Sequence, residues 1–221
     1  MKAYKGFFED LTCRGFQYEV GKTYKTDKAE LCNCGFHACK KMEDVIDYYY
    51  PWNYYWTRYC EVELGGTIVE GKDKACATEI TIIRMLSAGE VAELCGGLAR
   101  VREGDTWNFV NKDGRLVSDT WYDGAGIFRE GFALVERCDS FNYIGKDGKF
   151  LSAVWFGDAE DFREGFACVM LDDKWAFINP EGKYISDTWY DCAWCFIDDY
   201  ALVKLKGEYF YIDKEGKRIN D

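Results

Sequence analysis

Large apolar side chains alternate with polar or smaller ones in a segment that recurs through the second half of the chain. The segments WNFV, FNYI, WAFI and YFYI begin at Trp107, Phe141, Trp175 and Tyr209, a constant step of 34 residues. A turn sequence ending in glycine follows each: NKDG, GKDG, NPEG or DKEG. This alternation predicts half-buried β-strands, and glycine at the last turn position favours a tight hairpin.

Four further columns of residues keep the same step. They are Trp121, Trp155 and Trp189; Phe128, Phe162 and Phe196; Ala99, Ala133, Ala167 and Ala201; and Val101, Val135, Val169 and Val203. We expect about three short antiparallel strands per repeat: the alternating segment, a second such as RLVS, and a third such as FALVE. A single repeat cannot bury its aromatic rings alone, so neighbouring repeats should share a core that contains the Trp and Phe columns.

The repeats begin and end with incomplete copies. Residues 87–105 align with the second half of a later repeat, with Val91 in the place of Ala125 and Leu94 in that of Phe128. The last copy stops after its first hairpin. The pattern therefore predicts an all-β antiparallel array of about three 34-residue repeats with a half repeat at each end, arranged as a short rod or as a closed, twisted sheet.

The first part of the chain lacks this period and predicts a small α+β domain. Strands are expected in KAYKGF, in FQYEVGKTY, over 59–71 and over 77–86. Residues 40–50 have helical spacing and end at Pro51, which favours a helix. We therefore place a domain boundary between residues 1–87 and 88–221.

Two resemblances follow from quoted strings. WYDGAGIFREGFALV and WYDCAWCFIDDYALV resemble WG (KWG) repeats over about 130 residues. That family implies an interaction scaffold and brings no catalytic residue. CRGFQYEVGK and GFHAC resemble an uncharacterised domain of phage and prophage proteins, which implies a mobile-element origin.

A third resemblance concerns motif order. Tyr4–Gly6, Phe36–His37 and Glu79 are similar in order to the motifs of the ADP-ribosyltransferase-like fold. Lys5 stands where that family has a catalytic His or Arg, and His37 where it has Tyr or Ser. The resemblance thus implies an enzyme with a degenerate transferase domain as an alternative function.

The charge is unevenly distributed. The net charge is −11, and residues 88–221 hold 26 acidic against 16 basic residues, a net of −10. An acidic surface repels nucleic-acid phosphates and attracts basic protein surfaces, although solubility alone also favours it. MKAYKGFFEDL lacks a secretory signal, no apolar run is long enough to cross a membrane, and eleven cysteines fit a reducing compartment, so we expect a cytoplasmic protein.

The segment CNCGFHAC gathers cysteines around the single histidine. Zinc prefers four N and S ligands, which Cys13, Cys32, His37 and Cys39 would supply, with Cys34 as an alternative ligand. Buried cysteines that act as small hydrophobes are the competing interpretation, and a Cys–His nucleophile and base is a third. The Cys-x2-Cys pair in DCAWC has no second Cys/His pair in register, so a metal is not expected there.

These observations favour a non-catalytic protein-binding function. We expect an inhibitor, encoded by a phage or other mobile element, that binds a basic surface of a host defence protein. The aromatic segment YYYPWNYYWTRY has only one cation, Arg58, which argues against nucleic acid. The expected binding residues are Trp52, Tyr54, Tyr55, Trp56, Asp158, Glu160, Asp161, Asp198 and Asp199. A structural, self-associating repeat protein is a further alternative.

Overall fold

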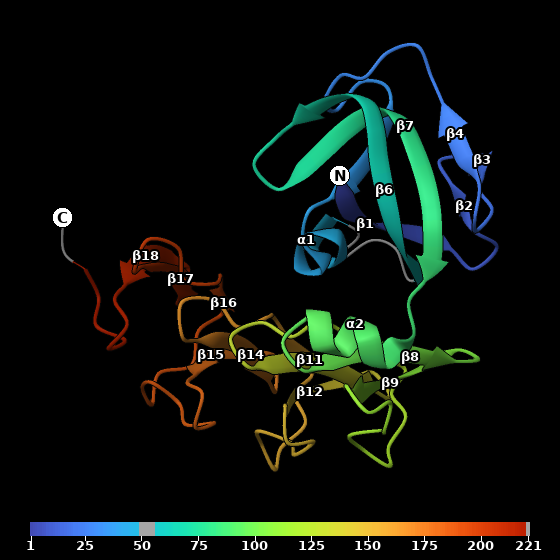
Figure 1. Ribbon diagram of the computed structural model, residues 1–221. Helices are drawn as coiled ribbons and strands as arrows, with labels where there is room; N and C mark the ends of the chain where they lie inside the picture. Colours follow the sequence, from blue (N-terminus) through green and yellow to red (C-terminus); the bar gives the residue numbers. More distant parts are fainter. Residues whose placement is uncertain (49–55, 220–221) are drawn as a thin grey trace. The chain divides into compact units, whose positions relative to one another are not determined.

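The computed structural model describes residues 1–48 and 56–219 and, within strand β6, does not describe the side chains of Trp56 and Thr57 (Figure 1). The chain is mostly β and divides into two compact units. The first unit holds residues 1–102 and 109–116, and the second holds 103–108 and 117–221. The boundary between the two units runs through the hairpin of β8 (Leu98–Glu103) and β9 (Thr106–Asn111). The predicted boundary after residue 87 stays a prediction.

The first unit is built on a sheet that closes on itself. Its strands are β1 (Lys2–Phe8), β4 (Thr23–Lys25), β5 (Phe36–Cys39), β6 (Trp56–Glu70) and β7 (Lys74–Met85), beside a small β2 (Thr12–Cys13) and β3 (Phe16–Gln17) pair. The order is β4-β7-β5-β1-β6, and β6 pairs back to β7. β1 and β5 meet at a single register pair, Tyr4 with Cys39. The seam between these two strands is therefore short.

Alternation along the long strands fills the inside of this sheet. Cys60, Val62 and Leu64 of β6 are buried, and Ile80 and Ile82 of β7 face them. The predicted period of two over 59–71 and 77–86 is thus confirmed.

Two helices pack on a second apolar cluster of the same unit. α1 (Met42–Tyr48) and α2 (Ala88–Leu94) bury Met42, Val45 and Val91 there with Cys39. The helix predicted over 40–50 is present as α1, and Val91 is buried as expected. Leu94, expected at a core position, is 37% exposed.

Two predictions for the first unit need correction. Residues 87–105 were expected to copy the second half of a later repeat, and 98–103 do so as β8, but 88–94 form α2, where Ser87 and Glu90 make a capping box. FQYEVGKTY was expected as one strand, but it is broken between β3 and β4. Gly21 in that break has φ +84°, a backbone conformation that a strand does not contain.

The second unit repeats a three-stranded sheet. The sheets are β10 (Gly124–Ala125), β11 (Phe132–Arg137) and β12 (Ser140–Gly145); β13 (Asp158–Ala159), β14 (Ala167–Leu171) and β15 (Lys174–Ile178); and β16 (Cys192–Ala193), β17 (Ala201–Leu205) and β18 (Glu208–Ile212). They follow one another in chain order in Figure 1. We call residues 107–140, 141–174, 175–208 and 209–219 repeats 1 to 4.

The middle strand predicted in each repeat is wrong. RLVS and its equivalents make only isolated bridges, such as Ile144 with Phe150. The third strand of each sheet is instead the short segment after the WYD string. The buried Asn142 side chain explains part of this, because its Nδ2 donates to the carbonyls of Ser152 and Val154 (2.9 and 3.3 Å) and holds that segment without a strand ladder.

Neighbouring repeats share their phenylalanines. Phe132 of repeat 1 stacks on Phe162 of repeat 2 at 4.8 Å, and Phe166 lies 5.0 Å from Phe196 of repeat 3. The shared core is therefore confirmed for this column. The tryptophans differ, because they are half-buried and pack on their own repeat, as Trp155 does on Phe150 (5.2 Å).

Candidate functional site

A ladder of carboxylates links one repeat to the next. Glu130 accepts hydrogen bonds from the backbone N–H groups of Glu164 and Gly165 (2.8 and 2.7 Å). Glu164 repeats the contact with the N–H groups of Asp198 and Asp199, both at 2.9 Å. Each carboxylate therefore holds the tight turn that lies 34 residues further along the chain.

These turns require unusual backbone angles. The two central residues of each turn have positive φ: 49° and 96° at Glu130 and Gly131, and 53° and 87° at Glu164 and Gly165. Two consecutive positive values characterise the two-residue turns that suit a β-hairpin. Because their N–H groups point outward, an acidic side chain from the preceding repeat can bind both.

One face of the β17–β18 hairpin is exposed, although the equivalent face is buried in each earlier repeat. Tyr211 is 55% exposed, whereas Phe109, Tyr143 and Phe177 in the same column are each 1% exposed. The covering group in an earlier repeat is a phenylalanine 19 positions later, as Phe196 covers Phe177 (5.0 Å).

We call this surface the terminal face. Alternation and register place its members on one side of the hairpin, because Leu202 pairs with Tyr211 and Lys204 with Tyr209. Its members are Ile197, Tyr200, Leu202, Lys204, Tyr209 and Tyr211. Tyr200, Tyr209 and Ile197 are at least half exposed. Sequence analysis missed this surface, although Tyr200 and Tyr211 were visible as the last members of aromatic columns.

The acidic residues predicted to bind a partner occupy two places. Asp158, Glu160 and Asp161 lie close enough that burial and then the two aspartates raise the pKa of Glu160. Asp161 also pairs with Arg129 Nε at 3.3 Å. The other two, Asp198 and Asp199, form the turn beside the terminal face, where Asp199 Oδ1 accepts a hydrogen bond from Lys214 (2.5 Å).

The predicted aromatic contacts fall outside what the structure describes. Trp52, Tyr54 and Tyr55 lie outside the described residues, and the side chain of Trp56 is not described. Their role as binding residues stays a prediction.

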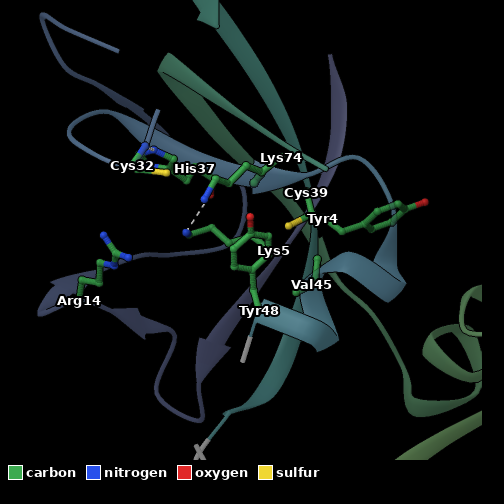
Figure 2. A pocket seen from close by; sticks show the side chains of 10 residues that line it. Tyr4, Lys5, Arg14, Cys32, His37, Cys39, Val45, Tyr48 and Lys74 are labelled. Carbon is green, nitrogen blue, oxygen red and sulfur yellow. Dashed lines mark hydrogen bonds between the residues drawn. The ribbon is translucent and has the colours of Figure 1, made fainter. Parts of the chain in front are cut away.

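The first unit contains a pocket beside the seam between β1 and β5. Its cavity volume is about 190 Å³, and its lining residues are Tyr4, Lys5, Arg14, Cys32, His37, Ala38, Cys39, Val45, Tyr48 and Lys74. In Figure 2 the side chains of Lys5, Arg14, Tyr48 and Lys74 lie around one space and come from β1, the β2–β3 turn, α1 and the start of β7, whereas the Tyr4 ring points away from it. Lys5, Arg14 and Lys74 are basic and, among these described lining residues, none is an aspartate or a glutamate.

Lys5 is the unusual member of this group. The residue is only 6% exposed, and its Nζ donates to the His37 carbonyl at 2.9 Å (Figure 2). In the part of the chain that the structure describes, no carboxylate lies within ion-pair distance of this ammonium group. Lys74 Nζ lies 4.4 Å from the Tyr48 ring centre, and a hydrogen bond with the Tyr48 hydroxyl is the main cause that raises the Lys74 pKa.

The proposed zinc ligands are brought together only in part. Cys32, His37 and Cys39 line the pocket, whereas Cys13 is buried in the cluster inside the closed sheet. His37 Nε2 accepts a hydrogen bond from the Cys32 N–H (3.1 Å), and burial lowers the His37 pKa. Burial, and then Asp44 and Asp73, raises the pKa of Cys39 to about 12.

No group of three or more His, Cys, Asp or Glu side chains within the described residues is arranged to hold a metal ion. All eleven cysteines are free, and the alternative ligand Cys34 accepts a hydrogen bond from Cys76 Sγ through its carbonyl (2.8 Å). A protonated thiol is a poor metal ligand. Zinc binding stays a prediction, which metal analysis of the purified protein before and after His37→Ala tests.

The transferase-like motif positions are also separated. Tyr4, Lys5 and His37 line the pocket, whereas Glu79 does not and pairs with Lys25 at 2.8 Å. This alternative therefore gains no support from Glu79.

The N-terminal and the C-terminal parts of the chain each match a known family. Residues 1–94 match the family described as "Domain of unknown function (DUF7666)". Residues 109–137, 143–175 and 175–209 match the "WG containing repeat" family. The WG-type repeats expected from the sequence are therefore present. No curated protein matches the chain.

Two solved structures are similar only in part. A chain described as "KlHsv2 with loop 6CD replaced by a Gly-Ser linker" is 10% identical, with a TM-score of 0.36, and the match covers 56% of this chain and 47% of that one. A protein of unknown function from Bacteroides caccae is 18% identical, with a TM-score of 0.28, covering 56% and 57%. The match thus spans about half the length of each. No helix in the described residues is long and apolar enough to span a membrane.

Proposed function

We propose that the protein acts without catalysis by binding another protein through its acidic repeat region, and that the terminal face is the contact surface. The observation that carries this proposal is the exposure of Tyr211, at a column position that three earlier repeats bury almost completely. Tyrosine rings that are partly exposed on a rigid sheet are typical of the centre of protein interfaces.

The charge of the region selects the class of partner. Residues 88–221 carry a net charge of −10, and Asp198, Asp199 and Glu208 lie in the repeats that hold the terminal face. A partner with a basic surface gains steering toward this region and avoids like-charge repulsion. Lysine or arginine side chains of the partner would also stack on the tyrosine rings, as Lys204 does on Tyr209 at 5.0 Å.

The repeats provide a rigid support for this surface. The Glu130 and Glu164 contacts and the stacked phenylalanine pairs join each repeat to the next. Interfaces held on such a support lose little conformational entropy on binding. We extend the proposal to inhibition of a host defence protein by a mobile-element protein, which rests on the resemblance of the N-terminal strings alone.

Affinity capture with matched variants tests the proposal. The full-length protein and its Tyr200→Ser/Tyr211→Ser variant are used as baits in host lysate at low and high salt. A partner that binds the wild type at low salt, and is reduced at least tenfold by the double variant, supports the terminal face. Tyr184→Ser, which removes a ring of similar exposure from repeat 3, is the control and should retain the partner.

Equal capture of every partner by the wild type and the double variant would contradict the proposal. Light scattering over a range of concentrations separates the self-association alternative. A dimer that dissociates in the Tyr200→Ser/Tyr211→Ser variant would show that a second copy covers the terminal face.

A further inference from the structure

The pocket in the first unit concentrates positive charge in a strongly acidic protein. Lys5, Arg14 and Lys74 line one cavity of about 190 Å³, while the whole chain has a net charge of −11. They come from β1, the β2–β3 turn and the start of β7, so that chain folding alone assembles them. In Figure 2 the Arg14 side chain reaches toward the Lys5 ammonium group from the turn.

The burial of Lys5 opposes folding unless something compensates for it. Its ammonium group donates one hydrogen bond to the His37 carbonyl and lies 5.7 Å from the Phe7 ring centre, so that up to two of its three N–H donors remain for a ligand in the pocket that Lys5 lines. A buried charge without an opposite charge is costly, and natural cores retain such a group mainly where it has a function. An anion in the cavity would supply both the missing charge and the missing acceptors.

The other residues that line the pocket indicate which further chemical groups a fitting ligand has. Ala38, Cys39 and Val45 give the cavity an apolar side, and the half-exposed Tyr48 ring stands at its edge beside Lys74. Cys39 adds no charge, because burial raises its pKa to about 12. A ligand that fits has an anionic head and a compact apolar or aromatic body.

We propose that this pocket binds a small phosphomonoester, with its phosphate on Lys5, Arg14 and Lys74 and its organic body against Val45 and Tyr48. A phosphomonoester carries between one and a half and two negative charges at neutral pH and three acceptor oxygens, which match three cations better than a carboxylate does. Arg14 offers a planar fork for two of these oxygens, and the lysines act as point charges.

Thermal unfolding and calorimetry of the full-length protein at low salt test the assignment, with phenyl phosphate as the probe. Phenyl phosphate should raise the melting temperature, and phenol, which lacks the charge, should leave it unchanged. Benzoate and inorganic phosphate should each bind at least ~10-fold more weakly, because each lacks part of the recognised chemistry. Benzoate binding as tightly as phenyl phosphate would overturn the phosphate assignment, and equally tight inorganic phosphate would overturn the role of the apolar wall.

Lys5→Met removes the buried charge while keeping the volume. This variant should bind phenyl phosphate at least ~10-fold more weakly, since a charge-assisted hydrogen bond is lost. Without ligand it should melt at a higher temperature than the wild type, because the unpaired charge is gone. The control Lys22→Met, at an exposed lysine paired with Glu19, should change neither binding nor the ligand-induced shift. Unchanged binding by Lys5→Met would overturn the proposal.

A second readout needs no variant. Cys32 is exposed and lines the pocket, and Cys138 is exposed in the second unit. Saturating phenyl phosphate should slow alkylation of Cys32 at least ~10-fold and leave Cys138 unaffected, as peptide mass spectrometry measures. Equal rates at Cys32 with and without the probe would show that the ligand does not enter this cavity.

Discussion

The carboxyl groups of Asp158, Glu160 and Asp161 lie close together. The structure therefore predicts whether ionisation of Glu160 stabilises or destabilises the folded protein. Burial, followed by Asp158 and Asp161, raises the pKa of Glu160 in the folded protein. The ionised form therefore costs stability above the folded pKa, and the cost disappears below the unfolded pKa of about 4.3. Glu160→Gln should stabilise the protein at pH 7 by about 0.5 kcal/mol, a small value because solvent screens the exposed part of this group.

Urea unfolding at pH 7 and pH 4 measures the Glu160 effect. The difference between Glu160→Gln and the wild type should be present at pH 7 and clearly smaller at pH 4, close to the unfolded pKa. The exposed Glu181→Gln is the matched control. A Glu160→Gln variant that loses stability at pH 7 would show that this carboxylate accepts a stabilising contact instead of suffering repulsion.

Single residues also show which features of the pocket could be predicted from the sequence and which could not. The clustering of Cys32, His37 and Cys39 indicated a site, and all three do line one cavity. Their bonding could not be predicted, because it depends on His37 accepting the Cys32 N–H and on Cys39 being buried. The sequence analysis named Lys5 only for its place in the transferase-like motif and did not predict its burial, because a lysine is seldom buried even on a strand face that it shares with Ala3 and Phe7.

At the scale of elements, the carboxylate ladder predicts a local effect of Glu164. Backbone hydrogen bonding by Asp199 is the main cause that lowers the Glu164 pKa, so the ionised form is the one that holds the turn. Glu164→Gln replaces one acceptor oxygen with a donor facing an N–H group. Amide exchange at Asp198 and Asp199 should then become at least ~10-fold faster, because the turn opens more often.

Hydrogen exchange with residue resolution measures this, with Glu181→Gln as the control. The wild-type protection of this turn should also fall as the pH drops through the folded pKa of Glu164, since a lowered pKa gives stability that is lost on protonation. Glu164→Gln should lack that acid dependence. Protection at Asp198 that is unchanged by the substitution would mean that packing alone holds the turn.

Elements differ in how completely the sequence specified them. The 34-residue step predicted where each repeat lies because glycine turns and aromatic columns keep their register. The second strand of each repeat was wrong, and in repeats 1 and 2 the side chains of Asn108 and Asn142 bind carbonyls that a strand would have paired. α2 departs from the register of the later repeats, which predicts no helix there, although Ser87 and Glu90 form a capping box that is recognisable in the sequence.

At the scale of the whole molecule, the sequence predicted two regions that differ in charge and repeat period, but it did not predict where the terminal face lies. The acidic charge of residues 88–221 and the repeat period both follow from counting residues. The terminal face required the structure, since Tyr211 keeps the 34-residue register of its buried counterparts. What differs is that Phe196 of the same repeat covers Phe177, whereas Tyr211 is 55% exposed.

The two proposed surfaces use separate residues in separate units, which predicts that each can be removed alone. Lys5→Met should abolish the response to phenyl phosphate and leave partner capture by the terminal face within twofold of the wild type. Tyr200→Ser/Tyr211→Ser should do the reverse, because none of the residues that line the pocket belongs to the terminal face. Thermal shift with phenyl phosphate and quantitative capture, run on the wild type, both variants and the combined variant, measure this. Additive losses are expected for independent sites. If Lys5→Met also abolished capture, the phosphomonoester would control the protein partner, and the separation of the two functions would be wrong.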